Sequence, residues 1–452
     1  MTSSNPRPTA DPEPADGDSL RVQRAVAQSR PAVDGPRDQV DGSAQRKSSI
    51  FTNGNFLLLW SGNAISLIGF NGVRIVYPLL ALVLTGSPIL ASCVGFAITV
   101  PSLLFPISAG IAADYWDRRR ILAACQWIGL AATLLATVPV ALQPPGVWLV
   151  LPVFVVAAFV EGTAQAFSGT SEQGLTRDVV SMAQRPAAFS LIAGEQPVAT
   201  VMGRALGGAA LGVTPSFPFL VNAVSYLYCL WSLSRMRGTQ PARPDVDAAN
   251  RARVRRWDHD WTGLKIVSTE RFLRATTAAV AATNAICQVV LLLIMLEIRD
   301  AGRSPTAVGL VLGATGLGGI LAVLAAAWLA NRVSARALFV WSQWALTVLL
   351  VPIALHTNPV LLALCWMGVG AVGATLNVTL TLYRLRIVPD HLLGRVIGAT
   401  QFIANGGVAV GALCAGVVLW MFGTSTTGWI LVVGMLMLAA ASMRHLREPN
   451  RP

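Results

Sequence analysis

Residues 88–142 read PILASCVGFAITVPSLLFPISAGIAADYWDRRRILAACQWIGLAATLLATVPVAL, in which two apolar runs flank a short charged turn. A helix needs about twenty residues to cross a hydrocarbon core of about 30 Å, and each run is long enough. At that depth a chain must satisfy its backbone hydrogen bonds internally, which a helix does within one segment. The stretch therefore predicts two membrane-spanning helices joined by the turn at residues 114–120.

The same alternation of apolar run and polar turn recurs along the chain. Hydrophobic residues make up 54% of it and charged residues 12%, whereas soluble domains are about 25% charged. We therefore predict an all-α membrane protein with twelve transmembrane helices in two pseudo-symmetric six-helix halves. The predicted helices cover residues 54–84, 88–113, 119–142, 146–171, 186–212, 215–235, 272–298, 304–330, 335–356, 358–385, 392–420 and 425–444.

The arginines are concentrated in alternate connections between these helices. One set includes residues 117–120 and 235–256, whereas the other set, such as residues 85–87 and 143–145, is nearly free of basic charge. Because positive charge collects in cytosolic loops, we predict a plasma-membrane protein with both termini in the cytosol. The alternation also argues against nucleic acid as the partner of a chain with net charge +12. The basic set continues with Arg177, Arg185, Arg332, Arg336, Arg384, Arg386, Arg395, Arg444 and Arg447.

Two polar segments suggest the domain boundaries. The first fifty residues contain six prolines and no apolar run, which predicts a disordered cytosolic tail. Two similar halves joined by a polar linker are typical of transporters with a central site between the halves. The predicted parts are the tail 1–50, the N-terminal bundle 51–237, the linker 238–268, the C-terminal bundle 269–447 and a short cytosolic tail 448–452.

The sequence contains no pattern for a metal, a disulfide or a nucleotide. The six cysteines lie inside apolar runs, and the four histidines are scattered at loops and helix ends. Asp-rich Mg²⁺ motifs, a nucleophile paired with a base, and a Gly-rich phosphate loop are all missing from the sequence. We therefore predict a protein that is not an enzyme, needs no cofactor or metal, and is not driven directly by ATP.

The charged turn belongs to the motif Gly110-Ile-Ala-Ala-Asp114-Tyr-Trp-Asp117-Arg118-Arg119-Arg120. This motif resembles the signature loop of the major facilitator superfamily, and its Asp-Arg-Arg sequence resembles the enterobactin-exporter and macrolide-efflux branch. Tyr115 departs from the usual basic residue and Asp117 from the usual glycine. A degraded copy, Ala327-Trp-Leu-Ala-Asn331-Arg332, stands at the equivalent place in the second half.

The resemblance implies a latch on the cytosolic side. A carboxylate beside arginines, near the positive N-terminus of another helix, would hold that side closed. The alternative is that Arg118 to Arg120 serve only to orient the helices. The candidate latch residues are Gly110, Asp114, Asp117, Arg118, Arg119, Asn331, Arg332 and Arg395, the last within Gly394-Arg395-Val396, which resembles the family's start of helix 11.

The fifth predicted helix contains Gly203-Arg204-Ala-Leu-Gly207-Gly208, which resembles the Gly-Pro-x-x-Gly-Gly signature of antiporters. Arg204 replaces the proline, and Phe70 stands where family members often carry an aspartate, so both departures weaken the inference of proton antiport. The glycines Gly203, Gly207 and Gly208 are predicted to allow close helix packing.

Ionisable side chains within the predicted helices are functional candidates, because an unpaired charge in the membrane costs several kcal/mol. The fourth predicted helix carries polar residues at steps of 4, 3 and 4, namely Glu161, Gln165, Ser168 and Glu172. They form one stripe, which must face the cavity or a partner helix. Glu161 is the first choice for a proton carrier or substrate contact, whereas Glu172 near the helix end has solvation as its alternative. The remaining candidates are Arg74, Glu195, Arg204, Asn284, Gln288, Asn377, Gln401 and Asn405.

Pairing within this set follows from helix geometry. Glu195 and Arg204 are nine residues apart, about half a turn round the helix, and are not expected to pair. Arg74 with Glu161 is one possible pair, either functional or a structural salt bridge. Interhelical hydrogen bonding is the alternative role for the neutral residues.

A cavity with few fixed charges and many apolar walls suits an amphipathic organic molecule. We predict a bacterial, proton-coupled secondary transporter that exports drug-, antibiotic- or siderophore-like molecules by alternating access, with the lipid bilayer and protons as its other partners and a monomer as its working form. The alternative is a facilitator or importer with the same fold. A non-transporting receptor would leave the two halves and the latch unexplained.

Overall fold

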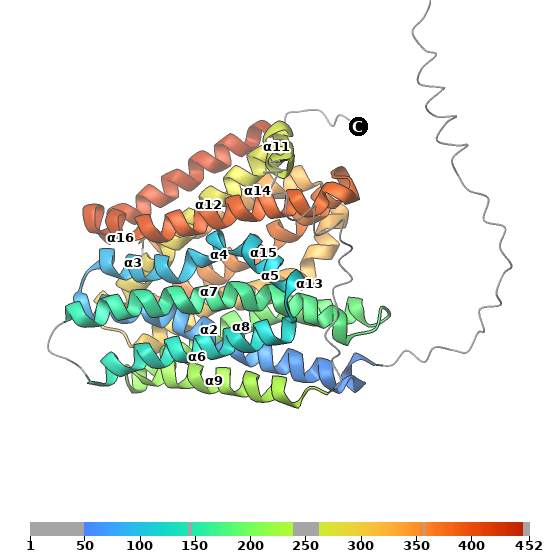
Figure 1. The fold of residues 1–452 in the computed structure, drawn as a ribbon. Coiled ribbons are helices and arrows are strands. Elements are labelled where there is room, and N and C mark those ends of the chain that lie inside the picture. Colours follow the sequence, from blue (N-terminus) through green and yellow to red (C-terminus); the bar gives the residue numbers. More distant parts are fainter. Residues whose placement is uncertain (1–48, 143–146, 238–261, 356–357, 446–452) are drawn as a thin grey trace, which may run out of the picture. The chain divides into compact units, whose positions relative to one another are not determined.

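The computed structural model describes residues 49–142, 147–237, 262–355 and 358–445, and all regular elements in these ranges are helices (Figure 1). The predicted tail 1–50, apart from its last two residues, lies outside the described residues. The same holds for most of the predicted linker and for the C-terminal tail 448–452.

The first half begins with the short 3-10 helix η1 (Ile50–Thr52) and the long helix α2 (Gly54–Thr85). The Asn53 side chain accepts a hydrogen bond of 3.1 Å from the Phe56 N–H and so caps α2 at its start. Gly86, with φ 66°, ends α2 in the left-handed conformation. The later helices of this half are α6 (Arg118–Leu142), α7 (Val147–Val179), α8 (Arg185–Val213) and α9 (Phe217–Arg235).

The prediction of one uninterrupted helix over 88–113 is wrong. The chain forms α3 (Pro88–Thr99), α4 (Pro101–Leu104) and α5 (Pro106–Tyr115), with a bend of 52° before α5. Proline has no N–H to donate and its ring clashes with the preceding turn, so Pro101 and Pro106 each start a new helix. Figure 1 shows these three pieces in succession.

The second half begins with α11 (Thr262–Thr269), inside the segment predicted as linker, and α11 packs against α16 (Asp390–Ser442). The helices predicted at 392–420 and 425–444 adjoin in α16, where the non-helical backbone of Gly423 (φ 69°, ψ 177°) divides the two. Four helices lie between α11 and α16 in the chain: α12 (Arg271–Asp300), α13 (Pro305–Arg332), α14 (Ala335–Leu355) and α15 (Pro359–Ile387). The 3-10 helix η2 (Met443–His445) follows α16.

Nine helices within the described residues are long and apolar enough to cross a membrane, or ten if the bent α3–α5 segment is one span. The 51-residue stretch of α16 is counted once, although Gly423 divides it. Helix α8 is not among the nine, and it carries Glu195 and Arg204. The predicted count of twelve is reached when α3–α5 is counted as one span, α16 is counted as two spans and α8 is included.

Glycines allow the close approach of α8 to its neighbours. A Cβ on Gly207 would lie 2.7 Å from the carbonyl oxygen of Gly72 on α2, and a Cβ on Gly208 would lie 2.8 Å from the Gly309 Cα on α13. Gly203 likewise lies against the α2 backbone. Because α13 belongs to the second half, α8 packs against both halves at a backbone distance that larger residues would not allow.

Buried aromatic rings hold α2, α7 and α9 together. The Tyr77 ring packs edge-on against Phe154 at 5.7 Å and against Phe219 at 5.1 Å between centroids. All three side chains are fully buried. This cluster fixes the position of the Tyr77 hydroxyl in the interior of the first half.

Candidate functional site

Glu161 lies in a sealed hydrogen-bond network of the first half. Its Oε1 accepts a bond of 3.0 Å from the Tyr77 hydroxyl and another from the Thr133 hydroxyl. The Asn222 amide donates to Oε2 at 3.4 Å and to the Thr133 oxygen at 2.7 Å. Glu161 has no exposed surface and lines none of the described cavities, so these contacts favour a structural role.

Further along α7 the polar stripe also faces partner helices. The Gln126 amide on α6 donates to the Ser168 hydroxyl at 3.5 Å, and the Gln126 oxygen accepts from Ser66 on α2 at 2.8 Å. Gln165 is half-buried and has no hydrogen bond within the described residues. Ser168 therefore lies in the interior between α2, α6 and α7.

Glu172 on α7 and Glu195 on α8 form a buried pair of carboxyl groups. Their exposed fractions are 5% and 6%, and they interact with each other and with the Asn63 amide on α2. No cation pairs with either group in the described part of the chain. Two like charges repel strongly in such a medium, so the pair is stable when it shares a proton. Glu172 is buried, and its alternative interpretation as a solvated residue is wrong.

Arg74 on α2 and Arg204 on α8 line one small cavity of about 40 Å³. Arg204 donates through Nη1 to the Leu312 carbonyl at 2.8 Å and to the Thr315 hydroxyl at 3.1 Å, both on α13. Arg74 has no hydrogen bond or ion pair with any described residue. The possible pair between Arg74 and Glu161 does not form, because the carboxylate is enclosed by its three other partners.

A polar chamber of about 260 Å³ lies within the second half, between α12, α14, α15 and α16. It brings together Asn284, Asn377, Gln401 and Asn405, whereas Gln288 lines the arginine cavity instead. Asn284 donates to the Ala404 carbonyl at 3.1 Å. The chamber is therefore lined by the amides expected from the sequence.

Arg384 also lines this chamber, although the sequence grouped it with the cytosolic arginines at the end of the helix predicted at 358–385. It lies in the last turn of α15 with 8% of its surface exposed. Its Nε is buried without a hydrogen-bond partner among the described residues. The expectation that Arg384 is one of the cytosolic loop charges is wrong, because its side chain is buried and lines the chamber.

The charged turn makes its contacts within the first half. Arg118 donates through Nη1 to both carboxylate oxygens of Asp178 at the end of α7, at 2.9 and 2.8 Å, and through Nε to the Ala113 carbonyl at 3.0 Å. Asp117 accepts from the backbone N–H of Arg119 at 2.9 Å and so caps α6. Asp114 is exposed and has no hydrogen bond or ion pair with a described residue.

The remaining latch candidates differ in their surroundings. Arg119 donates to the Leu233 carbonyl on α9. Gly110 has open space where a Cβ would be, and the Arg395 backbone lies against Gly263 of α11. Arg332 is exposed at the end of α13, and the side chain of Asn331 lies outside the described part of the chain.

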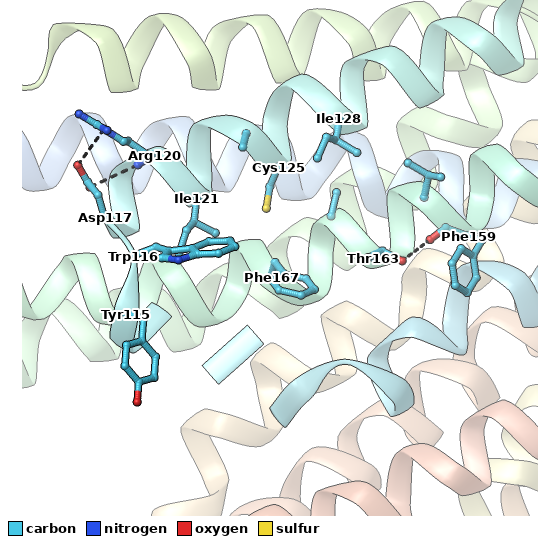
Figure 2. A pocket seen from close by; sticks show the side chains of 13 residues that line it. Tyr115, Trp116, Asp117, Arg120, Ile121, Cys125, Ile128, Phe159, Thr163 and Phe167 are labelled. Carbon is cyan, nitrogen blue, oxygen red and sulfur yellow. Dashed lines mark hydrogen bonds and ion pairs between the residues drawn. The ribbon is translucent and has the colours of Figure 1, made fainter. Parts of the chain in front are cut away.

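An apolar groove of about 760 Å³ runs between α6 and α7 beside the charged turn. Figure 2 shows its walls, where Trp116, Phe159 and Phe167 line one side and Ile121 and Ile128 the other. Its polar rim holds Asp117 and Arg120, whose Nε lies 3.5 Å from the carboxylate (Figure 2). A groove with aromatic walls and one charged end fits an amphipathic molecule.

Filling this groove tests whether substrates use it. Ala124 lines the groove and is exposed, so Ala124→Trp should occupy the space without disturbing buried packing. We expect the export predicted from the sequence to fall at least severalfold in this variant, with unchanged abundance in the membrane. Ala131→Trp, at an exposed α6 position outside the groove, is the matched control. Equal export by both variants would exclude the groove from the substrate path.

Comparison with known proteins identifies the family. Residues 47–450 match the family model described as transmembrane secretion effector. The chain belongs to this family of major facilitator transporters. It is therefore a multi-pass membrane transporter and not an enzyme.

The chain is similar to the multidrug efflux pump Tap of Mycolicibacterium fortuitum. The two sequences are 27% identical over 387 residues, which covers 84% of this chain and 93% of Tap.

Solved transporter structures share the fold. The nucleoside transporter NupG has a TM-score of 0.63 at 14% identity, covering 87% of this chain and 100% of NupG. A bacterial homologue of the iron transporter ferroportin, in its inward-facing state, has a TM-score of 0.64 at 13% identity, covering 88% and 100%. The D-xylose–proton symporter has a TM-score of 0.62 at 13% identity, covering 86% of this chain and 97% of the symporter. These likenesses establish the major facilitator fold.

Several contacts in this chain were not foreseen from its sequence. Tyr77, Thr133 and Asn222 surround Glu161 from three other helices, and Asp178 holds Arg118. For the contact between Arg118 and Asp178, the one signal in the sequence is Gly174, one turn before Asp178. A Cβ at Gly174 would lie 2.6 Å from the Arg118 Nε, so glycine leaves room for the guanidinium.

Proposed function

We propose that this transporter exports amphipathic small molecules by alternating access, driven by the proton motive force. The observation that carries the proposal is its similarity to an efflux pump over 84% of the chain. The apolar groove with a charged rim supports the substrate class. The proposal includes a monomer in the plasma membrane with both termini in the cytosol, supported by the alternation of arginine-rich connections.

The contacts between the halves indicate which end is closed. Near the start of α3, Ser92 donates to the Leu413 carbonyl of α16 at 3.4 Å. Asn405 of α16 donates to the Ser102 carbonyl at 3.2 Å. At the other end of this segment, Asp114 has no partner among the described residues. We infer that the cytosolic end is open here and that Asp114 engages the second half when that end closes.

Asp114→Asn tests this latch. We expect slower transport with unchanged membrane abundance, because the amide would lose the charge that interacts with a helix N-terminus in the closed state. Such an interaction contributes about 1 kcal/mol, so the closed state would lose about fivefold in population. Transport is measured as drug accumulation in a bacterial host, and Asp300→Asn, at another exposed acidic position, is the control. A wild-type rate for Asp114→Asn would remove the latch role.

The carboxyl pair is the best-supported site for protons. Glu172 and Glu195 come from two helices, α7 and α8, and α8 also packs against the second half. A change in the position of α8 relative to α7 would separate the two carboxyl groups and change their need for a shared proton. Proton binding and helix movement would be coupled in this way.

Drug accumulation in a pump-deficient bacterial host tests the function. The panel contains amphipathic antibiotics, dyes and siderophores, each measured with and without a protonophore. Export is expected to lower accumulation of at least one compound, and the protonophore should remove the difference. Faster uptake down a gradient, indifferent to the protonophore, would instead establish a facilitator.

The alternative function is a facilitator or importer of a small organic solute. Phe70 and Arg204, which replace an acidic residue and a proline of proton-coupled relatives, favour it. Importers also have this fold, as the D-xylose–proton symporter shows. The direction of transport in the accumulation assay separates the two functions.

A further inference from the structure

Two cationic side chains from different helices share one cavity inside the membrane-spanning part. Arg74 of α2 and Arg204 of α8 both line the 40 Å³ cavity, and their charges are close enough to interact. Gln288 and Leu291 of α12 complete the wall from the second half. The cavity therefore lies between the two halves, where an alternating-access transporter holds its substrate.

No carboxylate in the described part compensates these two charges. Glu161 is occupied by its three donors, and Glu172 and Glu195 interact with each other. Arg74 has no hydrogen bond or ion pair with a described residue, and the buried Nε of Arg204 has none either. Unpaired cations in a membrane interior are costly, and a pair of like charges in one cavity adds repulsion.

The hydrogen bonds of Arg204 fix its orientation. Its Nη1 is held by the Leu312 carbonyl and the Thr315 hydroxyl, which leaves Nε free to donate. A guanidinium recognises an oxyanion by parallel N–H bonds, and two guanidiniums neutralise the charge better than one. A volume of 40 Å³ is little more than that of one water molecule, so the cavity accommodates a charged head group rather than a whole molecule.

We propose that the cavity between Arg74 and Arg204 binds the oxyanion, such as a carboxylate or sulfonate, of the transported amphipathic molecule. This inference rests on the proposed export function and adds a charge to its substrate class. Ile75, Pro78 and Ile98 form apolar walls of the cavity, so the two guanidiniums are the only charged groups in its lining among the described residues. Because the cavity has walls from both halves, an anion there would also bridge them.

Binding to the purified full-length protein in neutral-lipid nanodiscs tests the proposal. Carboxyfluorescein serves as the anionic probe and rhodamine 6G as a cationic probe with the same ring system, both followed by fluorescence anisotropy. We expect saturable binding of carboxyfluorescein, weakened about tenfold to a hundredfold in Arg74→Gln, since hydrogen bonds to charged groups have this effect. Arg74→Lys should retain much of the affinity because it retains the charge.

Two further variants control for surface charge and for folding. Arg303→Gln removes an exposed arginine between α12 and α13, and should bind carboxyfluorescein as the wild type does. Arg204→Gln should weaken carboxyfluorescein binding as Arg74→Gln does, and Arg204→Lys, which keeps a charge beside α13, replaces it if it fails to fold. Sodium sulfate is added as a competitor of carboxyfluorescein, with sodium chloride at the same ionic strength as its control. We expect sulfate to compete only weakly, which distinguishes a site for organic anions from a site for inorganic ones.

The outcomes are distinct. Equal carboxyfluorescein affinity in wild type and Arg74→Gln, or no saturable binding, would overturn the proposal, as would complete displacement by millimolar sulfate. Export of rhodamine 6G without Arg74-dependent anion binding would leave the export function standing and remove the anion site. Arg74-dependent anion binding without export of any compound would keep the site and remove the export function.

Discussion

Glu195→Gln is expected to abolish protonophore-sensitive export while the protein remains folded and inserted. The amide has nearly the same shape as the carboxyl group and can still bond to Glu172 and Asn63, so packing between α7, α8 and α2 should persist. Glu172 and Glu195, however, no longer share a proton, because the amide at position 195 cannot bind or release one. Transport into proteoliposomes with an imposed pH gradient should fall to the level of uncoupled leak and become independent of pH.

Few polar or titratable groups face the carboxyl pair. Asn63 faces it from α2, and the Cys229 thiol of α9 interacts with Glu172; no arginine or lysine pairs with it in the described ranges. Glu172→Gln should therefore have the same effect as Glu195→Gln. Glu161→Gln is the matched control, since it makes the same chemical change in a sealed network. Wild-type pH dependence in Glu195→Gln would place the coupling proton elsewhere.

Glu161→Ala is expected to have the largest effect on stability. Truncation would remove the acceptor of two buried hydroxyl groups, those of Tyr77 and Thr133. A buried donor without its acceptor costs about 1–3 kcal/mol, so the two together cost about 2–6 kcal/mol. The lost side-chain volume adds a cavity beside Tyr77, Thr133 and Asn222. Thermal unfolding of the purified protein in detergent should show a clearly lowered midpoint.

Glu161→Gln separates the acceptor role from the charge. Both hydroxyls bond to the same oxygen, Oε1, so a glutamine with its carbonyl there keeps both bonds. The cost is confined to Oε2, where an amide would face the Asn222 amide at 3.4 Å. We expect near-wild-type unfolding and transport. If Glu161→Ala unfolds like the wild type, the network is not what holds α2, α6, α7 and α9 together.

The partners of individual charges were much harder to predict than the helices. Asp178 lies 60 residues from Arg118, and Tyr77 lies 84 residues from Glu161. A stripe such as Glu161–Ser168–Glu172 indicates that one face avoids lipid, but several helices were possible neighbours. Arg384 shows the same limit at a helix end, where an arginine grouped with the cytosolic charges instead faces a chamber.

The amino-acid sequence by itself determined the membrane class, most helix positions and the family motif, because helix length against bilayer thickness is a local property. It also placed the charged turn between two apolar runs. Only the tertiary structure decided that Glu161 is sealed, that Glu172 and Glu195 adjoin, and that Arg74 and Arg204 share a cavity. Those relations depend on the rotation and packing of separate helices, which glycines such as Gly207 and Gly208 set through backbone contacts distant in the chain.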